Sequence, residues 1–320
     1  MNAPEKFFLS ALPDVQATPD ERRLSIHQVG VKGLRYPIAM FDAEGTVRHT
    51  IAQISMSVGL PPEVKGTHMS RFVEILEADR PPLTQVGVTR MLEEMLVRLE
   101  SNSGRIELLF PWFIRKSAPV SGVSSLLDYD ARMVVEKTEG QYPALSLEIV
   151  APVTSLCPCS KKISERGAHN QRSHVTITAR TNDLVWIEDI VQLVEAQASC
   201  ELYGLLKRPD EKFVTERAYD NPKFVEDMVR DVAAQLNRDI GAFHFEPAQL
   251  RIAGRQGTRH VLLGIGLARL HPPPLRRLEQ RLHGLEVVVR RLHVPRFPRL
   301  EKRSGSHPEV LFLEPLVRDL

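Results

Sequence analysis

Apolar and polar positions alternate along two stretches near the start of the chain, residues 35–41 and 47–58. The four residues between them, Asp-Ala-Glu-Gly at 42–45, are typical of a turn. Alternation with a period of two on both sides of a turn predicts a pair of antiparallel strands. In residues 69–77 and 83–99 the apolar side chains then recur at helical spacing. The opening of the chain therefore predicts two strands followed by two helices.

After residue 99 the pattern again predicts strands followed by helices. Neighbouring strands lie too close in sequence to be joined by crossover helices, which excludes a doubly wound α/β fold. Pro222 is typical of the first turn of a helix, with Asp220 or Asn221 as its N-cap. The pattern predicts an α+β fold of two similar units in tandem, the bimodular plan of two antiparallel sheets, each with helices on one face. The further strands are expected at residues 105–114, 127–137, 144–151 and 174–180, and the further helices at 186–199 and 222–237.

The charge of the chain is unevenly distributed. Residues 241–320 contain 13 Arg and 1 Lys against 7 acidic residues, a net charge of +7. Residues 1–240 contain 28 basic and 33 acidic residues, a net charge of −5. No helical or strand period lasts in the basic part. This difference in charge indicates that the acidic and basic parts are separate regions of the chain rather than one uniform domain.

Three parts follow from these patterns: a polar N-terminal arm at residues 1–35, a bimodular folded domain at 36–243, and an irregular Arg-rich tail at 244–320. We interpret the tail as disordered or as the product of a shifted reading frame. An arm that binds nucleic acid through its arginines is a less favoured alternative.

The overall composition excludes several classes of protein. With 320 residues and 42% apolar content, the chain can bury a substantial core. Its apolar runs are far shorter than the roughly 20 residues of a membrane helix, and none near the start resembles a signal-peptide core. Two of its three cysteines, Cys157 and Cys159, are only one residue apart, where a mutual disulfide is badly strained. The sequence predicts a soluble cytoplasmic protein without disulfides.

A polar segment between two expected strands, residues 151–173, carries the most informative side chains. It contains Cys157, Cys159 and His169, and His174 follows at the start of the next strand. Thiolate and imidazole together suit zinc or iron(II). The spacing lacks the two close ligand pairs of a structural zinc site, but it allows three protein ligands and a water. The residues alone leave two other interpretations open, a cysteine buried as a small apolar group and a structural His174.

A carboxylate from the next polar connection can complete such a ligand set. Glu201, Glu211 and Glu216 all lie between residues 200 and 221, although a solvated turn explains them as well. Glu226 lies on the last expected helix, where it is either a solvent-facing acid or a group that binds a base.

Beyond these single residues, long ordered blocks of the sequence resemble type B GTP cyclohydrolase I, the metal-dependent enzyme that opens folate synthesis. The resemblance extends from about Leu12 to about Ala242. Its blocks are residues 29–38, 152–161, 167–175, 195–211 and 221–231.

The resemblance implies the tunnelling fold, with subunits assembled into a homotetramer and active sites between chains. It implies that Cys157 is the catalytically important metal-binding cysteine, His169 the metal-binding histidine and Glu211 the carboxylate on the metal side. Glu226 corresponds to the glutamate that anchors guanine, and Cys159 to a second active-site cysteine. Zinc, iron or manganese is the expected divalent metal.

The implied reaction converts GTP and water to 7,8-dihydroneopterin triphosphate and formate by metal-assisted hydrolysis at guanine C8. A bound divalent metal lowers the pKa of its water to about 7, and a histidine can move protons as the ring opens. A carboxylate such as Glu226 can accept hydrogen bonds from the N1–H and 2-amino groups of guanine, which adenine lacks. Candidate partners for the triphosphate are Lys161, Lys162, Arg166 and Arg172.

The end of the chain departs from the family pattern. Members close with a strand that carries a Glu-Ser-Ile-His motif, whose Glu and His belong to the active site, and no such motif occurs after Phe243. A catalytically impaired or non-catalytic relative is therefore the alternative function. Another relative within the fold, the nitrile reductase of the queuosine pathway, is disfavoured because its nicotinamide-binding signature is missing.

Overall fold

The computed structural model describes residues 16, 18–181, 184–239, 245–256 and 259–266. These residues belong to one compact unit, residues 1–288. For residues 245–266 only the backbone is considered below. No helix in the described ranges is long and apolar enough to cross a membrane.

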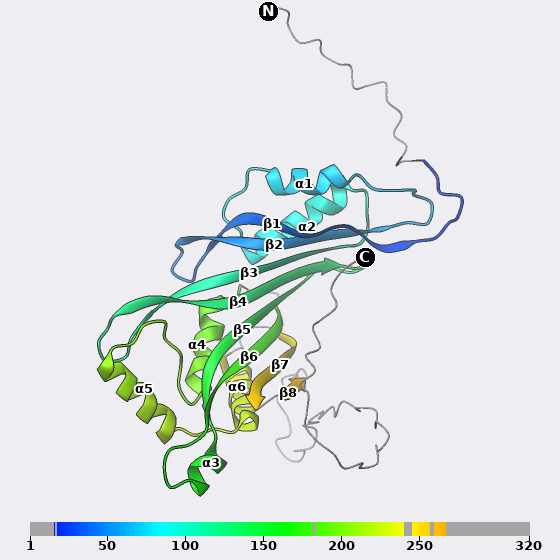
Figure 1. The fold of residues 1–320 in the computed structure, drawn as a ribbon. Coiled ribbons are helices and arrows are strands. Elements are labelled where there is room, and N and C mark those ends of the chain that lie inside the picture. The colour runs from blue at the N-terminus through cyan, green and yellow to red at the C-terminus, as the bar shows by residue number, and fades with distance from the viewer. Residues whose placement is uncertain (1–15, 17, 182–183, 240–244, 257–258, 267–320) are drawn as a thin grey trace, which may run out of the picture. The chain divides into compact units, whose positions relative to one another are not determined.

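The described strands form a single antiparallel sheet of eight strands, which are hydrogen-bonded in the order in which they occur in the chain (Figure 1). Six helices accompany them. The strands are β1 (Ile26–Phe41), β2 (Val47–Leu60), β3 (Gly104–Ser117), β4 (Ser124–Lys137), β5 (Ala144–Leu156), β6 (Asn170–Thr181), β7 (Phe245–Gln256) and β8 (Arg259–Gly266). The helices are α1 (Met69–Glu77), α2 (Gln85–Arg98), α3 (Pro158–Ile163), α4 (Ile187–Gln197), α5 (Arg208–Asp220) and α6 (Val225–Asp239).

The first half of the sheet, β1–β4, is covered by α1 and α2. Thr84 begins α2 as its N-cap, and its hydroxyl accepts a hydrogen bond from the Gly87 amide at 3.0 Å. Every second residue of β2 from Ala52 to Leu60 is buried, as the alternating pattern predicts. These side chains pack with the buried face of α2, including Val88, Leu92 and Met95.

The second half, β5–β8, is covered by α4 and α6, which pack against each other. Their buried side chains join the same apolar core as α2. The side-chain amide of Gln85, at the start of α2, binds both backbone groups of Val185 just before α4, donating at 2.6 Å and accepting at 3.2 Å. The two helical layers therefore begin beside each other on one face of the sheet.

The order of the predicted strands and helices along the chain is confirmed, with α3 and α5 added. Strands β3 and β4, however, belong with α1 and α2 rather than with the second unit, and the prediction of two separate sheets is wrong. β4 pairs with β5 from Glu136↔Ala144 to Asp130↔Val150, which joins the two halves. The turn between these strands is tight, and Gly140 takes φ +75° within it, a conformation that favours glycine. A short turn between two long strands leads naturally to their pairing, so one continuous sheet results.

The predicted boundaries of the N-terminal arm and the tail are also wrong in part. β1 begins at Ile26, inside the expected arm at 1–35, and its early part is interrupted by irregular register, which hides the strand period. β7 and β8 extend the sheet into the expected irregular tail at 244–320. The prediction for residues 267–320 lies outside the described residues.

Helix α6 starts later than predicted. Pro222 precedes it rather than forming its first turn, and neither Asp220 nor Asn221 is its N-cap. The reason is tertiary: the amide of Lys223 donates to the carbonyl of Leu156 at 3.0 Å, which holds the chain out of the helix at this point.

Candidate active site

Cys157 lies at the junction between a long strand and a short helix. β5 extends to Leu156, five residues beyond its predicted end, and Cys157 is the N-cap residue of α3, which Pro158 begins. The sequence predicted a loop here because a helix of six residues leaves almost no periodic signal. The Cys157 side chain is half-buried, whereas Cys159, inside α3, is exposed.

Cys157 and His169 are bound to each other through their backbones. The Cys157 amide donates to the His169 carbonyl at 2.9 Å. The Ser160 hydroxyl donates to the Cys157 carbonyl at 2.9 Å and accepts from the His169 amide at 2.8 Å. The structure thus brings together these two predicted site residues, and Ser160 is a connecting residue that the sequence did not reveal.

The surroundings of the Cys157 sulfur favour the thiolate. A hydrogen bond from the Ser160 backbone lowers the pKa of Cys157, and this effect, with smaller ones from Ser160 and Cys159, outweighs burial, which raises it. Thiolates at the N-terminus of a helix are stabilised in this way, and the thiolate is the nucleophilic and metal-binding form. Cys200 is the opposite case, because burial raises the pKa of its thiol to about 11. All three cysteines are free, as predicted.

Glu211 lies on α5, a helix in the segment whose sequence predicts only a polar connection. Val214 and Ala218, on the same face of α5 by helical spacing, pack in a small apolar cluster with Leu156 and Ala168. These two partners directly precede Cys157 and His169 in the chain. Glu211 itself is exposed and pairs with Arg208 at 3.5 Å.

Glu226 is the second residue of α6 and is exposed. The hydrogen bond from Lys223 to the Leu156 carbonyl ties the segment before α6 to the residue before Cys157. The start of α6 and the start of α3 are therefore anchored at the same point of β5.

No group of three or more His, Cys, Asp and Glu side chains that could hold a metal occurs in the part of the chain that the structure describes. The soft sulfur of Cys157 and the imidazole of His169 fit zinc or iron(II) by donor chemistry. Glu211 is not assembled with them in this single chain. Of the other carboxylates considered, Glu201 binds Tyr203 at 2.7 Å and Arg217 at 3.1 Å, and Glu216 pairs with Lys212 at 3.8 Å.

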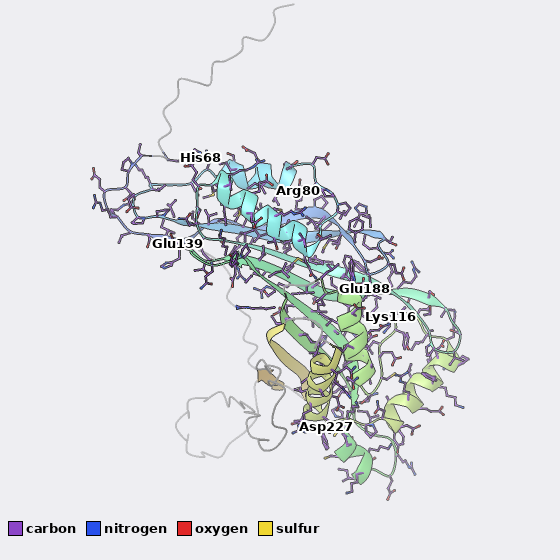
Figure 2. All side chains as sticks on the ribbon, turned by 180° about the vertical axis from the view of Figure 1, so that it is seen from behind. His68, Arg80, Lys116, Glu139, Glu188 and Asp227 are labelled. Carbon is purple, nitrogen blue, oxygen red and sulfur yellow. The ribbon has the colours of Figure 1, made fainter. Side chains whose placement is uncertain are left out.

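A partly buried ion pair that the sequence did not predict supports the connection between α4 and α5. Lys116 on β3 (Figure 2) donates to Glu195 and to the Leu202 carbonyl, both at 2.6 Å. The Tyr129 hydroxyl also donates to Glu195, at 2.8 Å, and burial raises the pKa of Tyr129. An isolated lysine in a strand pattern gives no signal of such a partner.

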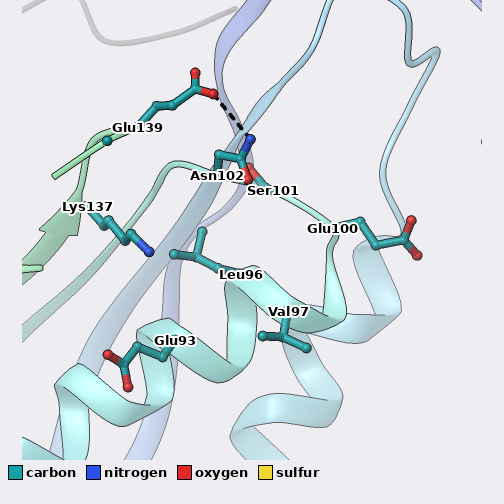
Figure 3. Close-up of a pocket in the computed structure, with 9 residues that line it drawn as sticks. Glu93, Leu96, Val97, Glu100, Ser101, Asn102, Lys137 and Glu139 are labelled. Atoms are coloured by element: carbon teal, nitrogen blue, oxygen red, sulfur yellow. Dashed lines mark hydrogen bonds between the residues drawn. The ribbon is translucent and has the colours of Figure 1, made fainter. Parts of the chain in front are cut away.

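A hollow of about 700 Å³ lies elsewhere, between the end of α2 and the ends of β3 and β4 (Figure 3). Its lining includes Glu93, Leu96 and Lys137, and Asn102 donates to Glu139 at 3.3 Å. None of the predicted site residues lines it.

The sequence is similar to known GTP cyclohydrolases. The family model described as type I GTP cyclohydrolase folE2 matches residues 12–252. "GTP cyclohydrolase FolE2 1" of Dechloromonas aromatica is 66% identical over 236 residues, 74% of this chain and 88% of that protein. "GTP cyclohydrolase FolE2" of Azoarcus sp. is 58% identical over 240 residues, 75% of this chain and 88% of that protein. Among solved structures, uricase from Arthrobacter globiformis is similar at 11% identity and a TM-score of 0.46, with 79% of this chain and 96% of that chain covered.

The match to the family model continues beyond residue 243 and includes part of β7. None of these comparisons supports the alternative of an impaired relative. With the model matching most of the chain and relatives more than half identical to it, the resemblance seen in the sequence is confirmed. The chain belongs to the type I GTP cyclohydrolase family.

Proposed function

We propose that the protein is a GTP cyclohydrolase that converts GTP and water to 7,8-dihydroneopterin triphosphate and formate, the first step of tetrahydrofolate biosynthesis. The observation that carries this proposal is the connection of Cys157 to His169 through Ser160, in a chain of this family. Cys157, whose thiol has a lowered pKa, and His169 are joined through their backbones where β5 ends and β6 begins.

Cys157 and His169 would hold a divalent metal, and we propose that Glu211 completes the ligand set. Sulfur, nitrogen and oxygen donors together suit zinc, iron or manganese to differing degrees. When bound, the metal supplies the Lewis acidity that activates water for attack at C8. The packing of α5 beside Leu156 and Ala168 supports the assignment of Glu211, since it anchors this helix next to both other ligands.

The remaining roles belong to side chains at the same end of the sheet. Glu226 would accept hydrogen bonds from the N1–H and 2-amino groups of guanine and so select guanine over adenine. Cys159, exposed on α3, is a second catalytic candidate. Proton transfer during ring opening falls to His169 or a neighbouring histidine, because an imidazole can both accept and donate a proton.

The structure refines the choice of triphosphate partners. The Lys161 ammonium group is already engaged by the Tyr219 carbonyl and lies 4.0 Å from the centre of the Tyr219 ring. Lys162, Arg166 and Arg172 are exposed and remain the better candidates.

We further propose that the working enzyme is a homotetramer with active sites between subunits. In the single chain His169, Glu211 and Glu226 are exposed, although they carry the predicted chemistry. The face of the sheet away from the helices also exposes large apolar side chains, which include Ile51 (61%) and Phe113 (44%). A second copy covering such surfaces would complete the site and remove apolar area from water.

The three free thiols fit a reducing compartment, and we propose the cytoplasm. We propose that the catalytic domain comprises the predicted residues 36–243 together with the early part of β1 and strands β7 and β8.

A direct assay tests the function. Purified protein is stripped of metal, reloaded separately with zinc, iron(II) or manganese, and incubated with GTP, while formate release and the fluorescence of the oxidised pterin are followed. We expect both products from GTP and neither from ATP. A folded, metal-loaded protein that releases no formate with any of the three metals contradicts the proposal.

A further inference from the structure

Asp210 is a completely buried carboxylate at the third position of α5, with 0% of its surface exposed. It accepts hydrogen bonds at 2.8 Å from the backbone amides of Val120 and Ser121, and at 2.5 Å from the Ser121 hydroxyl. It also accepts one from the Lys207 amide at 2.8 Å, which is the reach-back bond of a capping box at the start of the helix.

The bonds from Val120 and Ser121 to Asp210 join segments that are about 90 residues apart in sequence. Val120 and Ser121 lie in the turn between β3 and β4, and in Figure 1 one end of α5 lies beside this turn. The turn is itself well defined, because Ala118 donates to Val123 at 2.9 Å and Gly122 takes φ +70°. Asp210 therefore fastens the first turn of α5 to a rigid part of the first half of the sheet.

The connection that leads into α5 is held along the same strands. Lys116 donates to the Leu202 carbonyl, as described above. At Gly204 the backbone approaches β4 so closely that a Cβ atom would lie 2.7 Å from the Leu126 carbonyl oxygen. From its second turn onward α5 packs through Val214 and Ala218 beside Leu156 and Ala168. The helix thus spans from the β3–β4 turn to the residues that precede Cys157 and His169.

We propose that Asp210 is a positioning residue of the active site: by fastening α5 to the β3–β4 turn, it fixes the adjacent Glu211 in the orientation that the metal requires. The inference rests on the proposed role of Glu211. Groups outside the ligand set that orient a ligand typically contribute about 10- to 100-fold to metal affinity or activity.

Asparagine at position 210 distinguishes this role. It has nearly the same shape as aspartate, but its NH₂ group would face amide and hydroxyl donors and could not accept their bonds. Asp210→Asn should therefore weaken the attachment of α5 to the β3–β4 turn while the metal ligands stay in place. Asp189→Asn is the matched control, because Asp189 occupies the same third position of α4 and is exposed. Ser121→Ala removes a single donor, and Ser121→Thr restores the hydroxyl.

The experiment uses the full chain and three readouts. Affinity for zinc is measured by competition with a chromophoric chelator. The visible spectrum of the cobalt(II) form reports the number and type of ligands, and hydrogen exchange of the α5 amides is followed in metal-free protein. For Asp210→Asn we expect zinc affinity to fall about tenfold or more, an altered cobalt spectrum and faster exchange in α5. Turnover of GTP should fall while KM changes little, since Glu226 is untouched.

The smaller changes sharpen the result. Ser121→Ala should weaken zinc binding about two- to tenfold, as expected for one hydrogen bond, while Ser121→Thr and Asp189→Asn should match the unmodified protein. Unchanged zinc affinity and cobalt spectrum in a folded Asp210→Asn protein would overturn the inference. Because the unmodified protein is assayed with GTP alongside, a failure of the proposed function shows separately, as absence of formate release before any substitution.

Discussion

The two halves of the sheet share one plan and differ in what is added to it. The first half runs through β1 and β2, then α1 and α2, then β3 and β4. The second runs through β5 and β6, then α4 and α6, then β7 and β8. Two helices of the second half have no counterpart in the first: α3, between β5 and β6, and α5, between α4 and α6.

Most of the proposed catalytic and metal-binding residues lie on or next to α3 and α5. Cys157 and Cys159 belong to the start of α3, His169 follows α3, and Glu211 is on α5. Glu226 alone lies on a helix of the shared plan, α6. The first half contributes its β3–β4 turn as a support. We propose that the catalytic residues lie mainly on or beside the two helices that only the second half contains, and substitutions can test this proposal.

The most severe test is Cys157→Ala. It removes the thiolate that the start of α3 stabilises, so we expect the purified protein to lose its metal and GTP turnover to fall by at least about a hundredfold. Metal content is measured by elemental analysis and turnover by formate release. Cys200→Ala is the matched control, because Cys200 is a buried thiol whose raised pKa keeps it protonated.

For Cys200→Ala we expect metal content and turnover to stay near those of the unmodified protein, with a loss of stability of about 1 kcal/mol from the small cavity. Equal activity of the two alanine variants would show that Cys157 is not part of the active site. It would also show that the helices found only in the second half do not account for the activity.

A second test compares corresponding helices of the two halves. Glu226→Gln on α6 replaces a carboxylate that would accept two hydrogen bonds from guanine with an amide that can accept only at its oxygen. We expect kcat/KM for GTP to fall about tenfold or more. Glu93→Gln on α2, an exposed residue that lines the hollow of Figure 3, should leave kcat/KM unchanged. A loss with Glu93→Gln equal to that with Glu226→Gln would place function in the first half.

The shared plan, apart from β7 and β8, is the part of the structure that the sequence could predict. α1 was predicted to the residue, and the strands of the first hairpin were recognised, because their apolar residues keep one period and face one core. The helices α3 and α5 were not predicted, because tertiary contacts rather than a local apolar period define them. α5 has a mostly polar sequence, and its start depends on a carboxylate that bonds to a distant turn.

The residues of the candidate site also divide into those that the sequence predicted and those that it did not. Cys157, His169 and Glu226 were predicted from residue type and family pattern, and the structure adds the backbone hydrogen bond between the first two. Ser160 and Asp210 were not identified, because serine and aspartate are common in loops and neither periodicity nor spacing reveals which atoms they will bind. The strands β7 and β8 show that a backbone can join a sheet where composition predicts an irregular tail.

An intermediate effect is expected from Ser160→Ala, which removes the hydroxyl that connects Cys157 to His169. Zinc affinity, measured by chelator competition, should fall about tenfold, because the two ligands are no longer held together by this bridge. Ser164→Ala is the control from the same segment, since the Ser164 hydroxyl donates to the Arg166 carbonyl and accepts from the Arg166 amide. Equal zinc affinity in both variants would show that the bridge is dispensable.

The smallest effect is expected at an ion pair between β3 and β4, next to the strand pair β4–β5 that joins the two halves. Arg132 on β4 binds Glu107 on β3 at 2.5 Å and approaches Glu148 on β5 at 3.8 Å. Burial raises the pKa of Glu107, but the Arg132 and Arg105 guanidinium groups outweigh it and lower the pKa below its usual value. A lowered folded-state pKa means that ionised Glu107 stabilises the fold above the unfolded-state value of about 4.3, and that this contribution is lost as the pH falls through the folded-state pKa.

Glu107→Gln should therefore lower the free energy of unfolding in urea by less than about 1 kcal/mol at pH 7, because the pair is partly exposed to solvent. The difference between the variant and the unmodified protein should shrink as the pH is lowered below about 4. Glu44→Gln, an exposed substitution in the β1–β2 turn, serves as the control at each pH. A difference that stays constant with pH would show that Glu107 stabilises the sheet through packing rather than through its charge.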